Sequence, residues 1–568
     1  MSDPKIGVFV CHCGSNIGGI VDVPAVTEYA SKLKNVVCAK DNLYTCSDSG
    51  LREIKESIEE HDLDRVVVAS CTPRTHERLF RNTCEEAGLN KFLFEFANIR
   101  DQCSWVHMKN TEKATEKAKD LVRMGVAKAR LLQPMEDIEI DVVPSAMVVG
   151  GGIAGMSAAL SMANMGVSTY LVEREPQLGG MLNRLHALYP SHIKAAELVD
   201  SVKEKVVNHP NIDVLTSTEV KDIQGFIGNY EATVENDQSP TTLKVGAVIV
   251  ATGAQALAPE GEYGYKSMGT DGQEIPRSQK VVTQLELEQI LADEQRCKEL
   301  KDIVMIQCVG SRTEGRSYCS RACCVAAVKN SVLLKEANPD VNVFVLFRDI
   351  QTYTSGFEDY YAEAREKGVI FIRYSEERPP ELVDSVVGVY DELLGAQLGI
   401  PYDLLVLSTP LVPYDDAKEL ATMLKIPLEE NGFFLEAHVK LRPVDFATDG
   451  VYLAGCARWP ALVGEAISQA QAAASRAAIP LLNGHVQVEP IISSVDEELC
   501  AGCELCESLC AFKAIQLEMT EAGRKARVIT ASCKGCGSCG AACPQHAITM
   551  QHFTNAQIEA QIDALVSI

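Results

Sequence analysis

The chain lacks the long apolar run that a membrane-spanning helix needs. No stretch of its 568 residues approaches the roughly 20 consecutive apolar residues that cross a bilayer. It also lacks an excess of positive charge, because 53 Lys and Arg stand against 78 Asp and Glu. The net charge of -25 argues against nucleic acid and anionic membrane surfaces as partners, since both attract basic patches. We therefore expect a protein that is not embedded in a membrane and does not bind nucleic acid.

The start of the chain lacks the charged and apolar segments of a signal peptide, and Ile6–Val10 already resembles a strand. The chain is nevertheless rich in cysteine, with 21 residues. A protein that is not exported stays in a reducing compartment, where its cysteines bind metals more often than they form a disulfide framework. We expect a cytoplasmic protein, from an anaerobe, whose cysteines are mostly metal ligands.

Two cysteine runs near the C-terminus share the spacing C-x2-C-x2-C-x3-C. In ferredoxins with two 4Fe-4S clusters, three thiolates of a run bind one cluster and the fourth binds the other. Zinc or plain buried thiols fit poorly, because zinc ribbons use two pairs of cysteines rather than two quartets. The runs predict one cluster on Cys500, Cys503, Cys506 and Cys543, and a second on Cys533, Cys536, Cys539 and Cys510.

Composition divides the chain into three blocks. Residues 1–135 alternate apolar runs, such as Val66–Ala69 and Phe92–Phe96, with amphipathic stretches, which is typical of an α/β domain. An acidic connector, Glu136–Pro144, leads to residues 144–485, which have the βαβ rhythm of a doubly wound sheet. Residues 486–568 hold the two cysteine runs and predict a small α+β ferredoxin domain.

A glycine fingerprint follows the first strand of the second block. Gly150, Gly152 and Gly155 form G-x-G-x-x-G at a strand-to-helix turn, where a backbone without side chains can approach a pyrophosphate. Glu173 ends the next strand, at the place of the acid that binds a ribose hydroxyl. The fingerprint alone does not separate NAD from FAD.

Further motifs favour FAD. Ala251-Thr252-Gly253 resembles the A-T-G turn of flavoprotein reductases, and Gly450–Gly455 resembles their late FAD-binding strand. The late motif usually ends in Gly-Asp, whereas here Gly455 precedes Cys456, which is either a contact near the flavin or a small packed residue. The predicted FAD-binding residues are Gly150, Gly152, Gly155, Glu173, Gly180, Ala251, Thr252, Gly253 and Gly455.

A second nucleotide-type lobe, about residues 270–410, carries cysteines where a glycine-rich phosphate loop should follow the strand Asp302–Ile306. A helix is expected from about Val325 to Ala337. A third 4Fe-4S cluster beside the flavin is the main hypothesis, and a redox disulfide is the alternative, although vicinal cysteines fit ordinary disulfide geometry poorly. The candidate ligands are Cys308, Cys319, Cys323 and Cys324.

The first block also gathers cysteines after apolar, strand-like runs. If these strands are parallel, their carboxyl ends meet in one crevice, where open α/β sheets bind ligands. A fourth 4Fe-4S cluster is the main hypothesis, with inert thiols as the alternative, and five candidates compete for four places. They are Cys11, Cys13, Cys46, Cys71 and Cys103. Three other thiols, Cys38, Cys84 and Cys297, are expected to be ordinary buried residues.

Taken together, these motifs resemble the HdrA family, the FAD-carrying subunits of heterodisulfide reductases, over nearly the whole chain. The resemblance includes Gly7–Gly14, Tyr44–Asp48, Val68–Arg74 and Asn98–His107 in the first block. It implies a thioredoxin-reductase-like FAD domain flanked by cluster domains, with about four 4Fe-4S clusters. It also implies that Lys329 lies near flavin N5, where a cation would stabilise the reduced flavin; from the residues alone, Lys329 could equally be a solvated helix residue.

One departure from the family concerns length. Longer members carry an additional two-cluster ferredoxin after the region corresponding to Asn229–Asp237, and no cysteine occurs there in this chain. In the family that insert is linked to low-potential output toward ferredoxin. Its absence leaves open whether flavin-based electron bifurcation occurs here or requires a partner.

The resemblance implies an electron-transfer subunit of a hetero-oligomeric anaerobic oxidoreductase. Its flavin would convert between two-electron and one-electron transfer. Its partners would be HdrB-like and HdrC-like subunits, or a hydrogenase, formate dehydrogenase or NADH-oxidising module, and the complex could be doubled about a two-fold axis. The alternative is a self-contained NAD(P)H-dependent disulfide or thiol reductase. That hypothesis predicts an active-site C-x-x-C near the flavin, and the only such spacings belong to the C-terminal runs.

Overall fold

A computed structural model describes residues 3–236, 239–265, 267–268, 274–275 and 280–566. The chain divides into two compact units. Unit 1 joins Met1–Glu139 with Gln487–Ile568, and unit 2 is Ile140–Val486. No helix of the described residues is long and apolar enough to cross a membrane.

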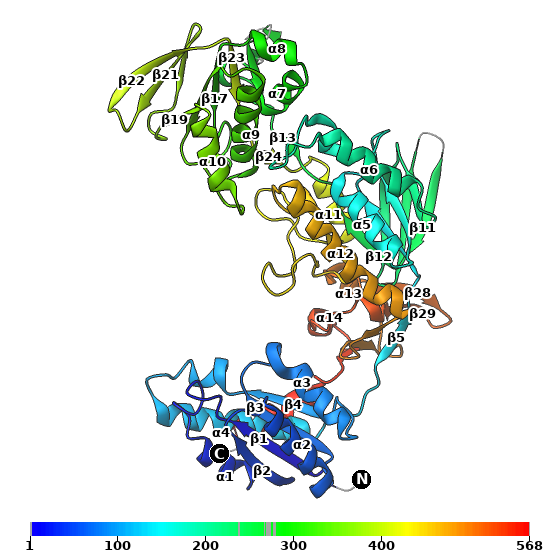
Figure 1. The fold of residues 1–568 in the computed structure, drawn as a ribbon. Coiled ribbons are helices and arrows are strands. Elements are labelled where there is room, and N and C mark those ends of the chain that lie inside the picture. The colour runs from blue at the N-terminus through cyan, green and yellow to red at the C-terminus, as the bar shows by residue number, and fades with distance from the viewer. Residues whose placement is uncertain (1–2, 237–238, 266, 269–273, 276–279, 567–568) are drawn as a thin grey trace. The chain divides into compact units, whose positions relative to one another are not determined.

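Unit 1 begins with a four-stranded parallel sheet of order β2-β1-β3-β4 (Figure 1). All six residues of β1 are buried, and so are all but the first of β3, because helices cover both faces of a parallel sheet. The expected strand at Phe92–Phe96 begins two residues later. The strands are β1 (Ile6–Cys11), β2 (Val36–Asn42), β3 (Arg65–Ser70) and β4 (Phe94–Asn98), and the helices are α1 (Val23–Ala30), α2 (Asp48–His61), α3 (Pro73–Glu86) and α4 (Thr111–Ala129).

The C-terminal part of unit 1 consists of short elements around the two cysteine runs. After them comes a helix, α15 (Asn555–Val566), that packs on α4, and Figure 1 marks both ends of the chain beside the sheet domain that contains α4. Two strand pairs, β27 with β30 and β28 with β29, are antiparallel. The elements are β27 (Ser493–Val495), α13 (Leu505–Leu509), β28 (Ile515–Thr520), β29 (Gly523–Val528), α14 (Ser538–Ala542) and β30 (Ile548–Met550).

The first lobe of unit 2 is a five-stranded parallel sheet of order β25-β12-β6-β7-β8. Its core is rich in alanine, which lets α5 and α12 pack closely on each other and on the sheet. The sheet strands are β6 (Ser145–Val149), β7 (Ser168–Val172), β8 (Ile212–Leu215), β12 (Ala247–Val250) and β25 (Val451–Leu453), and the helices are α5 (Ile153–Asn164), α6 (Ala195–Val207), α11 (Ala417–Leu424) and α12 (Val463–Asn483).

A three-stranded antiparallel sheet accompanies this lobe, with β10 between β9 (Glu219–Phe226) and β11. The family's insertion point falls between β10 (Asn229–Glu235) and β11 (Pro240–Val245). Residues 237 and 238 lie outside the described residues, whereas Asn236 and Ser239 are described. Residue 237 is the end of the segment that locates the insertion. Strand β5 (Ile138–Asp141), in the expected connector, pairs with β26 (His485–Val488).

The second lobe repeats the parallel design, with strand order β16-β23-β17-β18-β19. The expected strand Asp302–Ile306 is β17, and the expected helix is α9, which begins at Ala322 and therefore includes two cysteines in its first turn. The expected start of this lobe, near residue 270, falls outside the described residues. The other elements are β16 (Val281–Thr283), α7 (Gln284–Leu291), α8 (Glu294–Glu299), α9 (Ala322–Ala337), β18 (Asn342–Phe347), α10 (Phe357–Glu366), β19 (Ile370–Arg373), β20 (Glu381–Val383), β21 (Val386–Asp391), β22 (Ala396–Pro401) and β23 (Leu404–Leu407).

Candidate functional site

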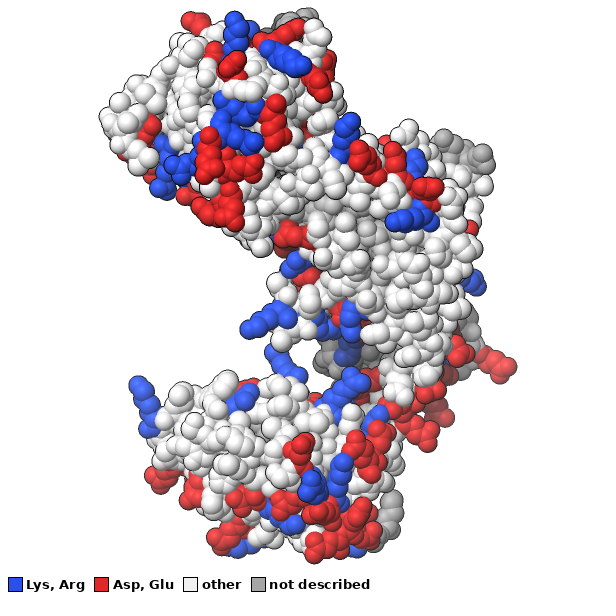
Figure 2. Space-filling view, in the orientation of Figure 1, with Lys and Arg blue, Asp and Glu red and all other residues white. Residues whose placement is uncertain are grey.

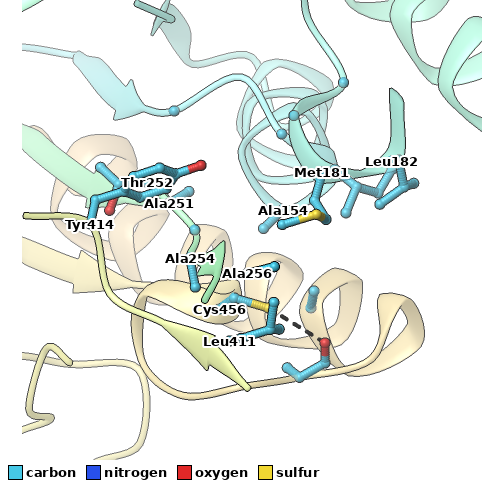
Figure 3. Close-up of a pocket in the computed structure, with 18 of the residues that line it drawn as sticks. Ala154, Met181, Leu182, Ala251, Thr252, Ala254, Ala256, Leu411, Tyr414 and Cys456 are labelled. Atoms are coloured by element: carbon cyan, nitrogen blue, oxygen red, sulfur yellow. Dashed lines mark hydrogen bonds between the residues drawn. The ribbon is translucent and has the colours of Figure 1, made fainter. Parts of the chain in front are cut away.

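A large cavity of about 790 Å³ opens in unit 2, between the turns that end its parallel strands. Residues of both lobes line it, as expected for a cofactor site at the carboxyl ends of an open sheet. Figure 3 shows Ala154 and Met181 on one side of the cavity and Ala251 and Thr252 on the other. The cavity lies within the roughly 300–1,000 Å³ range of cofactor sites.

The glycine fingerprint forms the tight turn between β6 and α5. Gly150 has φ +109°, which is a conformation that L side chains rarely adopt. A Cβ atom added to Gly155 would lie 1.7 Å from the Gly150 carbonyl oxygen, so no side chain fits there. Gly150 and Gly152 line the cavity, while Gly155 acts by allowing the turn to close on the helix.

The Glu173 carboxylate lies at the end of β7 and lines the cavity. It is buried, and its two oxygens accept backbone N–H groups, from Gly151 at 2.5 Å and from Glu175 at 2.8 Å. The turn therefore holds an acceptor group where the ribose of a dinucleotide is expected. The donor and acceptor groups of this turn fit an FAD adenosine half.

Four further predicted residues line the same cavity, namely Gly180, Ala251, Thr252 and Gly253. Gly455 lies behind it: its N–H donates to Gln469 Oε1 at 3.0 Å, and a Cβ atom there would lie 2.8 Å from Ala154 Cβ. Cys456 lines the cavity, with its Sγ 3.4 Å from the Ala461 carbonyl oxygen (Figure 3). The structure thus brings the separate FAD motifs of the sequence to one place.

Lys329 is buried in α9 and lines the cavity, which contradicts the alternative that it is a solvated helix residue. Its Nζ lies 2.5 Å from Glu288 Oε1 and donates to the Ala187 carbonyl oxygen at 2.7 Å. The other Glu288 oxygen accepts the His186 N–H at 2.9 Å. Burial lowers the pKa of Lys329, and the Glu288 carboxylate opposes that effect.

Sequence reasoning missed Glu288. It lies in α7, in a helical segment that alternates Leu and Glu, and nothing in that pattern separates it from the exposed acids of a surface helix. Only the fold, which packs α7 on α9, brings its carboxylate to Lys329.

The four cysteines of the second lobe lie close together at the end of β17 and the start of α9. Burial and then the nearby Cys324 and Cys319 thiols raise the pKa of Cys308 to about 11. The pKa of Cys323 is raised first by its hydrogen bond to Cys324 and then by burial. No disulfide joins any of the four, and Cys323 also lines the large cavity.

Backbone strain marks this segment. Cys308 has φ +64° and Arg321 has φ +46°, although neither is a glycine. Such conformations persist where the surrounding structure enforces them, often at functional sites. The Arg321 N–H donates to Cys319 Sγ at 3.3 Å, whereas Cys324 Sγ lies 3.8 Å from the Asp349 carbonyl oxygen.

In the N-terminal domain the structure brings together four of the five candidates. Burial raises the pKa of Cys46, and the neighbouring Cys11, Cys71 and Cys13 raise it further. They follow β1, β2 and β3, where the strand order changes direction between β1 and β3, which is the usual ligand position in such sheets. Cys13 has φ +45°. The Arg100 guanidinium lies beside these thiols; burial lowers its pKa, but the hydrogen bond to Asp101 and then Cys71 and Cys13 raise it above its usual value.

Cys103 does not join this group. It is buried in the hydrophobic core of the domain, and its thiol donates to the Ala114 carbonyl oxygen at 3.0 Å. Burial raises its pKa to about 11. The structure therefore places Cys103 among packed thiols, with Cys38, Cys84 and Cys297, all of which are buried.

In the C-terminal region, Cys500, Cys503 and Cys506 line a small cavity of about 20 Å³ with Cys543 from the other run. This is the exchange of the fourth cysteine that the spacing predicts. In the second set, the pKa of Cys539 is raised mainly by burial and further by the neighbouring Cys533 and Cys536. Cys510 Sγ accepts the Ala514 N–H at 3.2 Å, and its place in the second set stays a prediction.

The cysteine sulfurs make two kinds of hydrogen bond with the backbone. The sulfurs of Cys11 and Cys500 accept backbone N–H groups, as those of Cys319 and Cys510 do, and such bonds stabilise thiolate ligands and tune cluster potentials. Cys103 and Cys297 instead donate to carbonyl oxygens, and so does Cys324, so the direction of the bond does not by itself identify a ligand. Within the described residues, no group of three or more His, Cys, Asp or Glu is arranged to hold a single metal ion. A cubane takes one thiolate at each of four irons, so its ligands are spread more widely than those of one ion.

Comparison with known proteins gives two partial matches and several that span the chain. Residues 144–306 match the family model described as pyridine nucleotide-disulphide oxidoreductase, and residues 526–549 match the 4Fe-4S binding domain. Among solved structures, the thioredoxin reductase of T. acidophilum aligns with a TM-score of 0.41 and 18% identity, over 59% of this chain and 97% of that one.

Two relatives that span most or all of the chain are A subunits of heterodisulfide reductases. The HdrA subunit of the H(2):CoB-CoM heterodisulfide,ferredoxin reductase of Methanothermobacter marburgensis is 42% identical over 668 aligned positions, covering 100% of this chain and 98% of the relative. The corresponding iron-sulfur subunit of CoB--CoM heterodisulfide reductase from Methanocaldococcus jannaschii is 37% identical over 609 positions, covering 90% and 91%. The first alignment is longer than this chain, so the relative carries segments that this chain lacks. The chain therefore belongs to the HdrA family of heterodisulfide reductases and is an oxidoreductase subunit that depends on FAD and iron-sulfur clusters.

Proposed function

We propose that this chain relays electrons between partner subunits through one FAD and four 4Fe-4S clusters. The observation that carries the proposal is the gathering of cysteines into separate sets, each at a strand end or a repeat turn, in a chain that also has a large cofactor cavity. The flavin would supply exchange between two-electron and one-electron chemistry. This chain's own residues hold the groups, exclude water from the cavity and set its local charge.

The ligand sets follow from the thiols that lie together. Cys103 is the fifth candidate that we leave out, because its thiol is used within the core. We assign the clusters to Cys11, Cys13, Cys46 and Cys71, to Cys308, Cys319, Cys323 and Cys324, to Cys500, Cys503, Cys506 and Cys543, and to Cys533, Cys536, Cys539 and Cys510.

Lys329 is the residue that we assign to the flavin ring. It lines the same cavity as Cys323, and the Glu288 carboxylate fixes its Nζ. A cation held there would favour the reduced, anionic flavin. Because burial already lowers the pKa of Lys329, that site also has the means to hold or release a proton at Nζ.

The partners follow from the relatives. Their names link this type of subunit to H2 or formate and to CoB-CoM heterodisulfide and ferredoxin. We propose a cytoplasmic, hetero-oligomeric complex of this kind, with three domains in this chain, residues 1–135, 144–485 and 486–568. Because the chain has no cysteine at the family's insertion point, a ferredoxin-directed branch would need clusters from a partner.

A self-contained NAD(P)H-dependent disulfide reductase remains the second candidate, because residues 144–306 match a model of that type. An anaerobic titration separates the two. A reduced viologen dye should bleach both flavin and cluster absorbance in the purified protein, whereas NADH or NADPH alone should bleach neither. Stoichiometric bleaching of the flavin by NADPH, followed by reduction of a disulfide substrate, would overturn the relay in favour of the reductase.

A further inference from the structure

The two halves of the C-terminal cluster region have the same backbone. Cys500 corresponds to Cys533, and each later residue of the first run has a counterpart in the second. Helix α13 matches α14, and the left-handed turns match as well: Gly502 has φ +65° where Gly535 has +62°, and Lys513 has φ +46° where His546 has +51°. A difference between the two surfaces therefore comes from side chains and not from the fold.

The first half exposes large apolar side chains, and the second half does not. Leu505 and Leu509 lie one turn apart on α13, so they share a face of the helix. We call the four exposed side chains of this half the apolar face; they are Leu499 (54% exposed), Leu505 (41%), Leu509 (47%) and Phe512 (39%). Their counterparts are Ser532, Ser538, Ala542 and Gln545.

Charge differs between the halves in the same way. Exposed carboxylates accompany the apolar face at Glu497, Glu498 and Glu507, and a fourth, Glu504, forms an ion pair with Arg524. The counterparts of these four acids are Thr530, Ala531, Gly540 and Gly537. Lys513 is the single basic residue between positions 497 and 513. The apolar face thus has an acidic rim that the second half lacks.

This face lies over a predicted cluster site. Leu505 lines the small cavity together with Cys500, Cys503, Cys506 and Cys543, and Cys503 is itself exposed. An apolar surface ringed by polar groups is typical of a protein interaction site. At this position it would bring a partner close to the first cluster and not to the second.

We propose that the first half is the docking site for an electron-transfer protein whose contact surface is apolar and ringed by Lys or Arg side chains. The inference rests on the proposed function, since it requires a cluster on Cys500, Cys503, Cys506 and Cys543. One electron would pass from that reduced cluster to the partner's oxidised centre, with no bond made and no proton moved. The carboxylates steer the partner, and the apolar face holds it.

The test uses the holoprotein and oxidised cytochrome c, a basic electron acceptor whose haem edge is ringed by lysines. Binding between the two oxidised proteins is measured by titration calorimetry, and electron transfer from the reduced holoprotein is followed by stopped flow. Leu505→Ser with Phe512→Gln gives the first half the residues of the second. We expect this pair to weaken binding about tenfold, because it removes two anchors from the centre of the contact.

A second pair, Glu498→Gln with Glu507→Gln, tests the rim. We expect it to slow association about tenfold at low salt and to have little effect at high salt, because salt screens exposed charges. Two matched controls separate the site from its surroundings. Ser538→Ala with Gln545→Ala changes the equivalent positions of the second half, and Glu559→Gln with Asp563→Asn removes two exposed carboxylates from α15. Neither control should change binding by more than about twofold.

Equal losses in the test and control variants would overturn the inference, because they would show that net charge alone attracts the probe. Binding by the Leu505→Ser, Phe512→Gln variant at the original strength would also overturn it. The inference would also be overturned if this variant bound the probe normally but its clusters were reduced more slowly by the chain's own flavin, because the substitutions would then act inside the chain and not on docking. Iron and sulfide are measured in every preparation: a protein without clusters contradicts the proposed function itself, whereas intact clusters with no docking difference contradict only the docking site.

Discussion

At the scale of single residues, the hydrogen bonds of two cysteines in the N-terminal domain run in opposite directions. The Cys11 sulfur accepts the Thr45 N–H, and the Cys103 thiol donates to the Ala114 carbonyl oxygen. Cys11 ends β1 and Cys103 follows β4 of the same sheet, so they are equal candidates by sequence pattern alone. The difference arises because the π-helical turn Arg100–Ser104 points Cys103 into the core.

A pair of substitutions tests this assignment. Cys71→Ala should remove about four irons per chain, because a cubane that loses one thiolate ligand is not retained. Cys103→Ala should leave the iron content unchanged and lower the stability of the N-terminal domain modestly, since it removes a packed sulfur. Iron and acid-labile sulfide assays on both variants measure the difference. The assignment would be contradicted if Cys103→Ala lost iron while Cys71→Ala kept its full iron content.

The Lys329–Glu288 pair gives a second prediction at this scale. Removing either partner leaves a buried charge without compensation, which costs about 3–5 kcal/mol, whereas removing both costs less. Lys329→Met and Glu288→Gln should therefore each lower stability more than the double variant does. Chemical denaturation followed by flavin release measures all three, and additive effects of the two substitutions would contradict the coupling.

The same pair predicts a pH dependence. Burial holds the pKa of Lys329 below its usual value in the folded chain. Between the folded and the unfolded pKa, the unfolded chain binds more protons, so the free energy of unfolding should rise with pH in that interval. Lys329→Met should reduce this slope. The denaturation midpoint measured at pH values up to about 10 tests it, and an identical slope in the variant would exclude Lys329 as its source.

At the scale of elements, the turns decide the function. The β6–α5 turn closes only because Gly155 has no side chain, and the β17–α9 connection carries cysteines where a nucleotide-binding turn would carry glycines. We therefore expect two lobes of similar design to hold different groups, because their first turns differ.

Gly155→Ala tests the first turn. Its Cβ atom would lie 1.7 Å from the Gly150 carbonyl oxygen, and overpacking of this kind costs on the order of 1–3 kcal/mol. We expect FAD to be largely lost while the C-terminal clusters remain. Gly315→Ala is the matched control, because no atom lies within 4 Å of its added Cβ. Flavin content per chain is the measurement, and full flavin in Gly155→Ala would contradict the role of the turn.

Much of the fold follows from the sequence because its motifs are local. The glycine turn, Glu173 and the strand Asp302–Ile306 each lie within one element or its edge, and the structure has them in place. Long-range contacts could not be predicted. Glu288 reaches Lys329 only through helix packing, and α15 packs on α4, where Arg123 Nη2 donates to the Leu565 carbonyl oxygen at 3.4 Å. Helix α9 begins three residues before its expected start, because Ala322 and the two cysteines after it have no distinctive helical pattern.

At the scale of the whole molecule, the chain places its cofactor sites in two compact units. Cysteine sets lie in both, and the flavin cavity lies in unit 2. On the face seen in Figure 2, a wide uncharged area covers the first lobe of unit 2, while acidic and basic side chains mix over the other parts. The excess of negative charge favours partners with basic contact surfaces.

The central claim is that four cubanes and one flavin share this chain, and one measurement tests it most directly. The intact protein is purified without oxygen, and its iron, acid-labile sulfide and flavin are quantified per chain. The account predicts about sixteen irons, about sixteen sulfides and one FAD. About eight irons with one FAD would contradict it, because only the C-terminal region would then hold clusters and the remaining cysteine sets would be thiols.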